Sequence, residues 1–224
     1  MSQDINAAFI RQYESEVHQA YQQMGSKFRG TTRLKSNIVG ESTTFQKVGK
    51  GSAAQKTRHG KVPVMNINHS NVTATLQDWY GGDYVDKLDE LKINFDERQI
   101  QVNAGAWALG RKVDELVITA MRTGLPSGSK VAVTYPSGAN SKGLRWAKVL
   151  RSIELLNSFD VPDDGQRFCA VGAHQWAELM TFDEFTNSDY IGPNLPYLQG
   201  TQPRRWMNVI WFMSTQLDVT AGIR

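Results

Sequence analysis

The sequence predicts an α+β fold, and three observations lead to this class. After Asp96 the apolar residues repeat at helical spacing over a long segment, and the basic segment before it alternates as strands do. Beyond residue 140, helical patterns and short apolar runs follow one another without the regular alternation of a doubly wound sheet. With 224 residues, the chain is long enough for one domain or two small lobes with a sizeable core.

The composition narrows the class of protein. Hydrophobic residues make up 40% and charged residues 21%, as in a globular protein. No run of eighteen apolar residues occurs, so we expect no membrane-spanning helix, and Met1 to Ile10 show no secretory signal. The only cysteine, Cys169, excludes an intrachain disulfide framework and fits a reducing compartment. A net charge of +3 is too small to indicate nucleic-acid binding by itself.

The first segment has the pattern of an amphipathic helix that ends at Gly25. One interpretation is a helix packed on its own domain, and the other is an arm that docks on a neighbouring subunit. For an arm, we expect Phe9 and Val17 on the contacting face. The apolar residues at helical spacing are Ile5, Phe9, Tyr13, Val17, Tyr21 and Met24.

The next segment, from Ser42 to Gln77, contains no acidic residue. Its middle, 49–54, is rich in small residues and predicts a mobile tip, while the flanks alternate at period two. We expect a long two-stranded ribbon, which is only marginally stable alone and so lies against another copy of the chain. The alternating residues are Val62, Val64, Val72, Ala74 and Leu76, and the cations are Lys47, Lys50, Lys56, Arg58 and Lys61.

The strongest element is a long helix after Asp96. Asp96 and Gln99 can form a capping box, and Gly124 and Pro126 close the far end. At 1.5 Å per residue the helix would span roughly 40 Å. Its apolar residues are Ile100, Ala104, Trp107, Val113, Leu116, Val117, Ala120 and Met121.

The second half of the chain predicts two shorter helices and two buried strands. We expect helices at 141–157 and 173–185, a turn at 161–165, and strands at 167–171 and 209–213. In the first of these helices, an apolar face would oppose a basic face. The apolar face holds Trp146, Val149, Leu150, Ile153 and Leu156, and the basic face holds Lys142, Arg145, Lys148 and Arg151.

No motif indicates catalysis or a cofactor. The glycine-rich stretches form neither a phosphate loop nor a dinucleotide fingerprint, and the four histidines show no metal-ligand spacing. Cys169 lies in an apolar run near His174, and burial would raise its pKa and make it inert. The best candidate for a hard cation is an acidic group that lacks the spacing of a calcium loop, so a solvated loop and helix start is favoured. This acidic group is Asp78, Asp83, Asp86, Asp89 and Glu90.

Several segments, in order, resemble the major capsid proteins of tailed bacteriophages, which share the HK97-like fold. The resemblance covers nearly the whole chain, from the N-terminal segment through the ribbon and the long helix to the last apolar strand. The segments are Ile10–Val17, Tyr21–Ser26, Thr44–Gly49, Arg58–Gly60, Asp78–Tyr80, Asp83, Val85–Asp86, Leu88–Asp89, Ala108, Arg111, Asp114, Ile118, Val161–Pro162, Arg167, His174–Trp176, Leu179, Asp189–Tyr190, Gly200 and Trp206–Leu217.

The resemblance implies a division of the chain into four parts. Residues 1–37 would be the N-terminal arm, 38–82 the extended loop that lies over the adjacent subunit, 83–135 the peripheral domain with its spine helix, and 136–224 the axial domain. Family members continue after Leu217 through further strands, so we expect the final peripheral strands to be absent. Asn208 stands where relatives often have glycine.

The implied function is a structural subunit, not an enzyme, that self-assembles through hexamers and pentamers into an icosahedral capsid around double-stranded DNA. A separate scaffolding protein and a portal are implied, with assembly in the host bacterial cytoplasm, non-specific DNA contact and no membrane. The ribbon cations and the arm would contact neighbours, and the acidic group would receive the ribbon. Two alternatives remain open: an encapsulin-like compartment shell, and an enzyme that uses the acids of 78–90 with His69 or His174.

Overall fold

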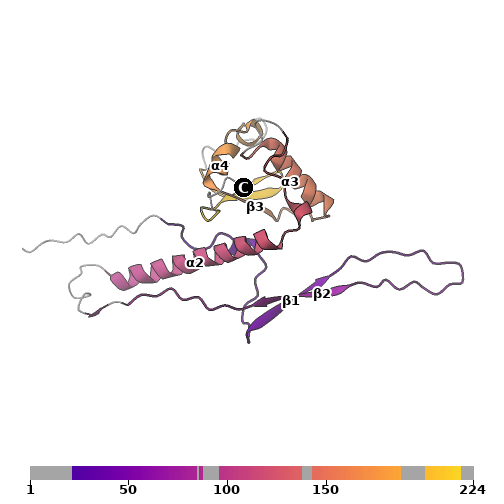
Figure 1. The fold of residues 1–224 in the computed structure, drawn as a ribbon, viewed down its shortest axis with the longest axis horizontal. Coiled ribbons are helices and arrows are strands. Elements are labelled where there is room, and N and C mark those ends of the chain that lie inside the picture. Colours follow the sequence, from indigo (N-terminus) through magenta and orange to yellow (C-terminus); the bar gives the residue numbers. More distant parts are fainter. Residues whose placement is uncertain (1–21, 85, 88–95, 138–142, 188–199, 218–224) are drawn as a thin grey trace, which may run out of the picture. The chain divides into compact units, whose positions relative to one another are not determined.

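The computed structural model describes residues 22–84, 86–87, 96–137, 143–187 and 200–217 (Figure 1). The chain forms two compact units, one made of Met1–Thr32 with Gly81–Arg224 and the other of Arg33–Tyr80. Most of the helix predicted before Gly25 lies outside the described residues, but its described end, Gln22–Met24, is not helical, so the prediction is wrong for these three residues. Gly25 itself has a φ of 69°, the left-handed conformation that favours glycine.

The Arg33–Tyr80 unit is a two-stranded antiparallel ribbon. Strand β1 (Ser42–Val48) pairs with β2 (His69–Thr75), in a register that runs from Ser42 opposite Thr75 to Val48 opposite His69. Beyond the strands the chain continues as a long loop (Figure 1). The predicted ribbon is confirmed, but the strand assignment of Val62 and Val64 is wrong. Pro63 between them has no N–H to donate to a ladder.

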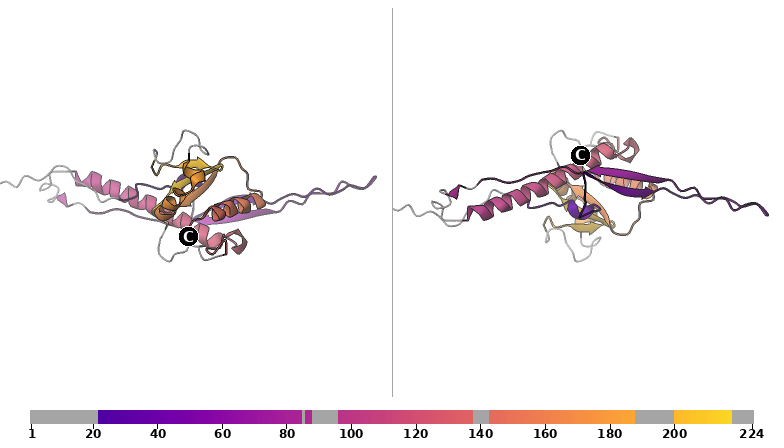
Figure 2. Two further views of the ribbon diagram at one scale, coloured as in Figure 1. Left: turned by 90° about the horizontal axis from the view of Figure 1, so that it is seen from above. Right: turned by 90° about the horizontal axis from the view of Figure 1, so that it is seen from below.

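Helix α2 (Glu97–Gly124) is the long helix that the sequence predicts. The Asp96 carboxylate accepts a hydrogen bond from the backbone N–H of Gln99 at 3.2 Å, as in a capping box. The Gln99 side chain instead donates to Asn103. Figure 2 shows α2 as one uninterrupted rod in both views. A short 3-10 helix, η3 (Ser127–Ser129), follows it, and another, η2 (Arg29–Thr31), precedes the ribbon.

Helix α3 (Trp146–Ser158) begins five residues later than the predicted start at Ser141. Gly143 has a φ of 79°, and Arg145 is extended, so the chain enters the helix only at Trp146. Lys148, predicted on the basic face, is buried instead, and its amine donates to the Gly143 carbonyl at 2.6 Å. Leu150, predicted on the apolar face, is 41% exposed.

The second sheet has three strands in the order β3-β5-β4. Strand β3 (Arg167–Val171) runs parallel to β5 (Val209–Met213), and β4 (Arg204–Trp206) runs antiparallel to it. The strands predicted at 167–171 and 209–213 are confirmed. Between β3 and β4, the predicted helix 173–185 is divided into α4 (Ala173–Leu179) and α5 (Asp183–Thr186). The Thr181 hydroxyl donates to the Glu178 carbonyl, a local bond that competes with helix continuation.

The two faces of this sheet contribute to two hydrophobic clusters. On one face, α3, α4 and α5 contribute to a core that includes Val149, Trp176, Leu179, Phe185 and Trp211. On the other face, Phe212 packs with Phe28 and with Ile118 of α2. The core therefore ties α2 and the segment before η2 to the sheet of the larger unit.

Candidate functional site

The ribbon has no hydrophobic core of its own. Every residue of Arg33–Tyr80 is described, and Thr43 alone is buried. All residues of β2 are exposed, and apolar side chains such as Val48, Val64 and Val72 face solvent. A ribbon with this composition lacks the buried apolar area that stabilises larger sheets.

One aromatic side chain, in the middle of β1, contacts the segment that precedes this strand. Phe45 lies opposite Val72, and the side chains of Arg33 and Lys35 approach the Phe45 ring at 5.9 and 5.8 Å from its centroid. Lys35 also donates to the Thr44 carbonyl at 3.4 Å. Cations over an aromatic face are attracted by the ring quadrupole, so the segment before β1 is held against the ribbon.

The net positive charge of the chain is concentrated in the ribbon unit. Arg33–Tyr80 holds seven Lys and Arg against two acidic residues, a net charge of +5, which leaves −2 for the rest of a chain whose total is +3. The five predicted contact cations all lie outside the strands or at their ends and are exposed: Lys47, Lys50, Lys56, Arg58 and Lys61. The predicted contact surface is thus a solvent-facing basic segment.

The predicted acidic acceptor residues fall on both sides of the unit boundary. Asp78 belongs to the ribbon unit, whereas Asp83 and Asp86 belong to the larger unit, and all three are exposed. Asp83 accepts a hydrogen bond from the N–H of Tyr84. Asp89 and Glu90 lie outside the described residues, as do Phe9 and Val17. The contacts of the acidic residues, and of Phe9 and Val17, with a neighbouring subunit stay predictions.

A buried carboxylate anchors the segment that follows residue 21. Asp114 of α2 is fully buried and accepts hydrogen bonds from Gln23 Nε2 at 2.7 Å, Lys27 N at 3.0 Å, Phe28 N at 3.2 Å and the Ser26 hydroxyl. Four donors converge on the two carboxylate oxygens, and such bonds to an ionised group are stronger than neutral ones. We call Gln22–Phe28 with Asp114 the anchor.

Further contacts fix the anchor to α2 and to the end of β5. Arg111 donates to the side-chain oxygen of Gln22 at 2.6 Å. Gly110 lies so close to Gly25 that a Cβ at position 110 would be 2.7 Å from the Cα of Gly25. The Lys27 amine donates to the Met213 carbonyl at 2.9 Å, and Phe28 meets Phe212 edge-to-face. The resemblance pointed to Arg111 and Asp114, but their role emerges only from these long-range contacts.

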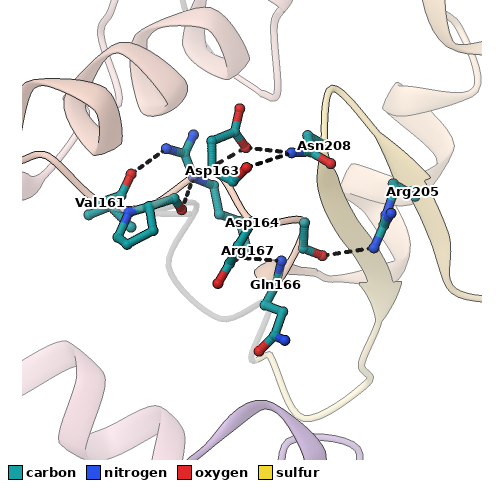
Figure 3. Close-up of polar contacts among 9 residues, drawn as sticks. Val161, Asp163, Asp164, Gln166, Arg167, Arg205 and Asn208 are labelled. Carbon is teal, nitrogen blue, oxygen red and sulfur yellow. Dashed lines mark hydrogen bonds and ion pairs between the residues drawn. The ribbon is translucent and has the colours of Figure 1, made fainter.

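A second polar network joins the turn before β3 to the hairpin between β4 and β5 (Figure 3). Arg167, 7% exposed, donates to the carbonyls of Val161 and Pro162 at 2.6 and 3.1 Å. Asn208 Nδ2 donates to the backbone carbonyl and to the carboxylate of Asp163 at 3.2 and 2.7 Å. Arg205 donates to the Gly165 carbonyl at 3.0 Å. Side chains of β3, of β4 and of the hairpin loop therefore hold this end of the sheet to the turn at 161–165.

Asn208 also explains a departure from the family pattern. The two-residue hairpin loop consists of Met207 and Asn208, with φ of 51° and 58°. A two-residue loop with both φ positive is the type I′ turn, which favours Asn and Gly. Asn tolerates this conformation better than other non-glycine residues, so the backbone keeps the turn that glycine would allow.

The described residues hold no arrangement that suggests catalysis. Among them, no three His, Cys, Asp or Glu side chains lie close enough to hold a metal ion. Burial raises the pKa of Cys169 to about 12, so its thiol stays protonated at neutral pH. Cys169 lines a cavity of about 730 Å³. His174 of α4 is exposed, and its Nδ1 lies 3.5 Å from the carboxylate of Glu178. This contact pairs His174 with an acidic side chain and not with a nucleophile. His69 is exposed on β2.

In the part of the chain that the structure describes, no helix combines the length and the apolar character needed to cross a bilayer.

Comparison with solved structures shows where this fold occurs. The chain is similar to the capsid protein of the cyanophage P-SCSP1u, with 18% identity and a TM-score of 0.69, over 97% of this chain and 71% of that one. It is also similar to the cyanophage Pam1 capsid protein (14%, TM-score 0.62, 94% and 74%) and to that of Mycobacterium phage Che8 (16%, TM-score 0.60, 94% and 76%). A search of curated proteins finds no match.

The α+β fold, with its coreless ribbon and long helix, is the fold of these phage capsid chains. The sequence matches the family described as phage capsid protein over residues 5–222, and the chain belongs to this family. The predictions of a capsid fold and of a structural, non-enzymatic capsid subunit are confirmed, and the encapsulin-like and enzyme alternatives are not favoured. As a capsid protein of a bacteriophage, it associates with itself in the shell of the virion.

Proposed function

We propose that the basic ribbon joins neighbouring subunits of the shell by lying on the acidic residues at 78–90 of an adjacent copy. One observation carries the proposal: the Arg33–Tyr80 unit has a net charge of +5 and no buried hydrophobic side chain. A ribbon of this kind needs an external surface to become rigid, and a neighbouring copy supplies one many times over in a shell.

Charge sets the orientation of this contact more than its affinity. Individual exposed ion pairs are worth roughly 0–1 kcal/mol, so a single substitution has little effect. Complementary charge at many repeated contacts steers the encounter and suppresses wrong orientations. Apolar side chains that face solvent on the ribbon, such as Val64 and Val72, supply area for the same contact.

The N-terminal arm makes the second intersubunit contact. Phe9 and Val17 lie on the predicted apolar face of the segment before Gly25. Phe9→Asp places a charge where an apolar contact forms, which costs several kcal/mol if the site is buried. Subunits with this change keep their fold, because the anchor begins only at Gln22, and they fail to form shells.

At the level of the particle, the subunits form hexamers and pentamers of an icosahedral capsid that encloses double-stranded DNA. Assembly takes place in the host bacterial cytoplasm with a separate scaffolding protein and a portal. Support comes from the family and from the solved phage capsids with this fold. Contacts with DNA are non-specific and weaken with salt, since dispersed cations meet phosphates without reading bases.

The test is a charge reversal of the ribbon. Replacing Lys47, Lys50, Lys56, Arg58 and Lys61 together with Glu leaves the core of the larger unit untouched, so the variant folds but yields no stable shells. The matched control replaces five exposed cations of the larger unit with Glu, which gives the same change in net charge; these are Arg29, Arg98, Arg122, Lys130 and Arg145. Electron microscopy and sedimentation count the shells. Normal assembly of the ribbon variant refutes the proposed contact.

A further inference from the structure

The pairing register of the ribbon continues beyond its two strands. Two segments, 49–56 after β1 and 61–68 before β2, run out to a common tip, and we call them the arms (Figure 1). Neither arm is a strand. The N–H of Gly49 nevertheless donates to the Asn68 carbonyl at 2.7 Å, and these two residues are the next pair after the last pair of the strands. The register of β1 and β2 therefore extends to the start of the arms.

The turn at the tip lies in the same register. Carried outward one pair at a time, the register brings Thr57 opposite Gly60. The N–H of Gly60 does donate to the Thr57 carbonyl, at 3.0 Å. Such a bond closes a two-residue hairpin loop, here Arg58 and His59. The arms thus have equal lengths between two correctly paired points, so a continuous hairpin needs no bulge.

Pro63 is compatible with this continuous hairpin. Opposing residues of an antiparallel pair alternate between hydrogen-bonded and non-hydrogen-bonded pairs. Gly49 and Asn68 form a hydrogen-bonded pair, so Pro63 and its partner Ala54, five pairs further out, form a non-hydrogen-bonded one. The nitrogen of Pro63 then points to the outer edge of its arm. Its missing N–H removes a donor that only a further strand would use, and the ladder between the arms stays intact.

Two features oppose this pairing in the free subunit, and the first is the turn. Backbone φ is positive at His59 (121°) but not at Arg58. The two-residue loops that match the twist of the strands have a positive φ at the first loop residue, and other loops splay the strands. The hairpin of β4 and β5 has the matching kind, with positive φ at Met207 and Asn208, and its strands pair up to the turn. The tip turn of the ribbon therefore splays the arms.

The second feature is a pair of like charges. In the continued register, Lys56 lies directly opposite Lys61, next to the turn. Like charges that face each other directly destabilise an antiparallel pair. Both side chains are exposed, so a carboxylate of another molecule can reach them. Pairing also brings Lys50 onto the same face, because alternate residues of a strand share a face.

We propose that the ribbon pairs to its tip only on a neighbouring subunit, where acidic residues trigger the pairing by neutralising Lys56 and Lys61. The inference rests on the proposed contact with the acidic residues at 78–90 and adds how that contact is regulated. In the free subunit, repulsion between the two lysines keeps the arms apart. On the neighbour, exposed carboxylates such as Asp83 and Asp86 offset this repulsion. The outer half of the ribbon therefore becomes ordered when it binds.

A charge substitution in the free, full-length subunit tests the trigger without any assembly. Lys61→Glu turns the like-charged pair into an oppositely charged one, and we expect the amides of the ladder between the arms to exchange about tenfold more slowly. The matched control, Lys50→Glu, makes the same change of charge on the same face. Its partner in the register is Ile67, so exchange stays unchanged. Hydrogen exchange resolved to single residues measures both variants. The ladder amides are those of Gly51, Ala53, Gln55, Val62, Val64 and Asn66.

The turn gives an independent variant. Arg58→Asn combined with His59→Gly supplies the Asn-Gly sequence that favours the matching turn, and we expect it to protect the same amides while both lysines are kept. If this variant protects the amides and Lys61→Glu does not, the lysine trigger is refuted. If neither variant protects them, the arms do not share the register of the strands, and the whole inference is refuted.

A comparison of unmodified subunits, free and in shells, separates this inference from the proposed function. We expect the ladder amides of the arms to be protected only in shells. Their protection in free subunits, or their free exchange in shells, overturns the inference and leaves the proposed contact standing. Equal effects of Lys61→Glu and Lys50→Glu do the same. The proposed contact itself fails when the five-cation variant of the ribbon assembles normally.

Discussion

The two sheets of this capsid subunit are of similar size and opposite construction. In the β3-β5-β4 sheet, Val209, Trp211 and Phe212 are buried under helices on both faces. In the β1-β2 ribbon, a register of seven residue pairs forms without one buried hydrophobic side chain. Hydrogen bonds alone contribute little net stability, so the first sheet is stabilised from within the subunit and the second depends on what it binds.

This difference separates folding from assembly within one chain. We predict that substitutions in the three-stranded sheet change the stability of the subunit, whereas substitutions in the ribbon change the stability of the shell.

The largest effect is expected for Phe185→Ala. Phe185 is fully buried, and its ring meets Trp176 and Trp206 edge-to-face at centroid distances of 6.2 and 5.0 Å. Loss of the ring leaves a cavity and lowers the free energy of unfolding by about 3–5 kcal/mol. Urea denaturation followed by tryptophan fluorescence measures the change. In the ribbon, Val72→Ala shifts the same curve by less than about 0.5 kcal/mol, and equal shifts would erase the distinction between the two sheets.

The reactivity of a thiol at different pH values gives a second comparison of the two sheets. Burial raises the pKa of Cys169 to about 12 from an ordinary value of 9.0, and the thiolate is the reactive form. At pH 8 the native protein therefore holds roughly a thousandfold less thiolate than the unfolded chain, since each pKa unit is a factor of ten. Alkylation of Cys169 in the native subunit is slower by a similar factor and accelerates as the pH rises past 9.

A cysteine placed in the ribbon provides the contrast. Ser70→Cys lies on the exposed β2 and reacts at the rate of a free thiol in the unassembled subunit. Rapid alkylation of Cys169 at pH 8, measured by mass spectrometry, would show that the three-stranded sheet opens as readily as the ribbon.

Asp114→Ala removes the acceptor of the anchor. Four donors then lose their partner within a buried site, and we expect the free energy of unfolding to fall by about 2–4 kcal/mol. Asp164→Ala is the control, because Asp164 is exposed and accepts one local hydrogen bond from Gln166 N. A change below about 1 kcal/mol for Asp114→Ala would mean that the anchor contributes little to the fold.

Local sequence patterns predicted the helices and strands, but not which of their side chains are buried or what those side chains contact. The capping residue Asp96 and the apolar run of β5 depend on neighbours in sequence, and both were found as predicted. The burial of Lys148 depends on the Gly143 carbonyl, and the late start of α3 on the turn at Gly143. The sequence shows apolar residues at helical spacing in α2, but only the packing of Phe28 and the sheet shows which face is buried.

The candidate contact surfaces were predicted only in part, because a local pattern shows composition and not long-range contacts. An acid-free stretch from Ser42 to Gln77 is visible in the sequence, and the structure adds that it has no core. The anchor was not predicted, since Asp114 meets donors 86 to 91 residues away. Its one signal in the sequence was that Asp114 stands among the residues that resemble the capsid family.

The smallest expected effect concerns the hairpin of β4 and β5. Asn208→Gly keeps the left-handed turn but loses the hydrogen bonds to Asp163, and Asn208→Ala loses both the bonds and the favourable turn conformation. We expect losses of about 0.5 and about 1–2 kcal/mol, respectively, in the free energy of unfolding. If Ala is tolerated as well as Gly, the turn geometry does not matter at this position.

Amide hydrogen exchange, measured on free subunits and on assembled shells, tests the central claim most directly. We predict that the amides of Ser42–Val48 and His69–Thr75 exchange fast in the free subunit and slow by roughly a hundredfold or more in shells, while those of β3 and β5 are protected in both. A ribbon that is as protected in the free subunit as β5, or that stays unprotected in shells, would contradict the claim that neighbours stabilise it.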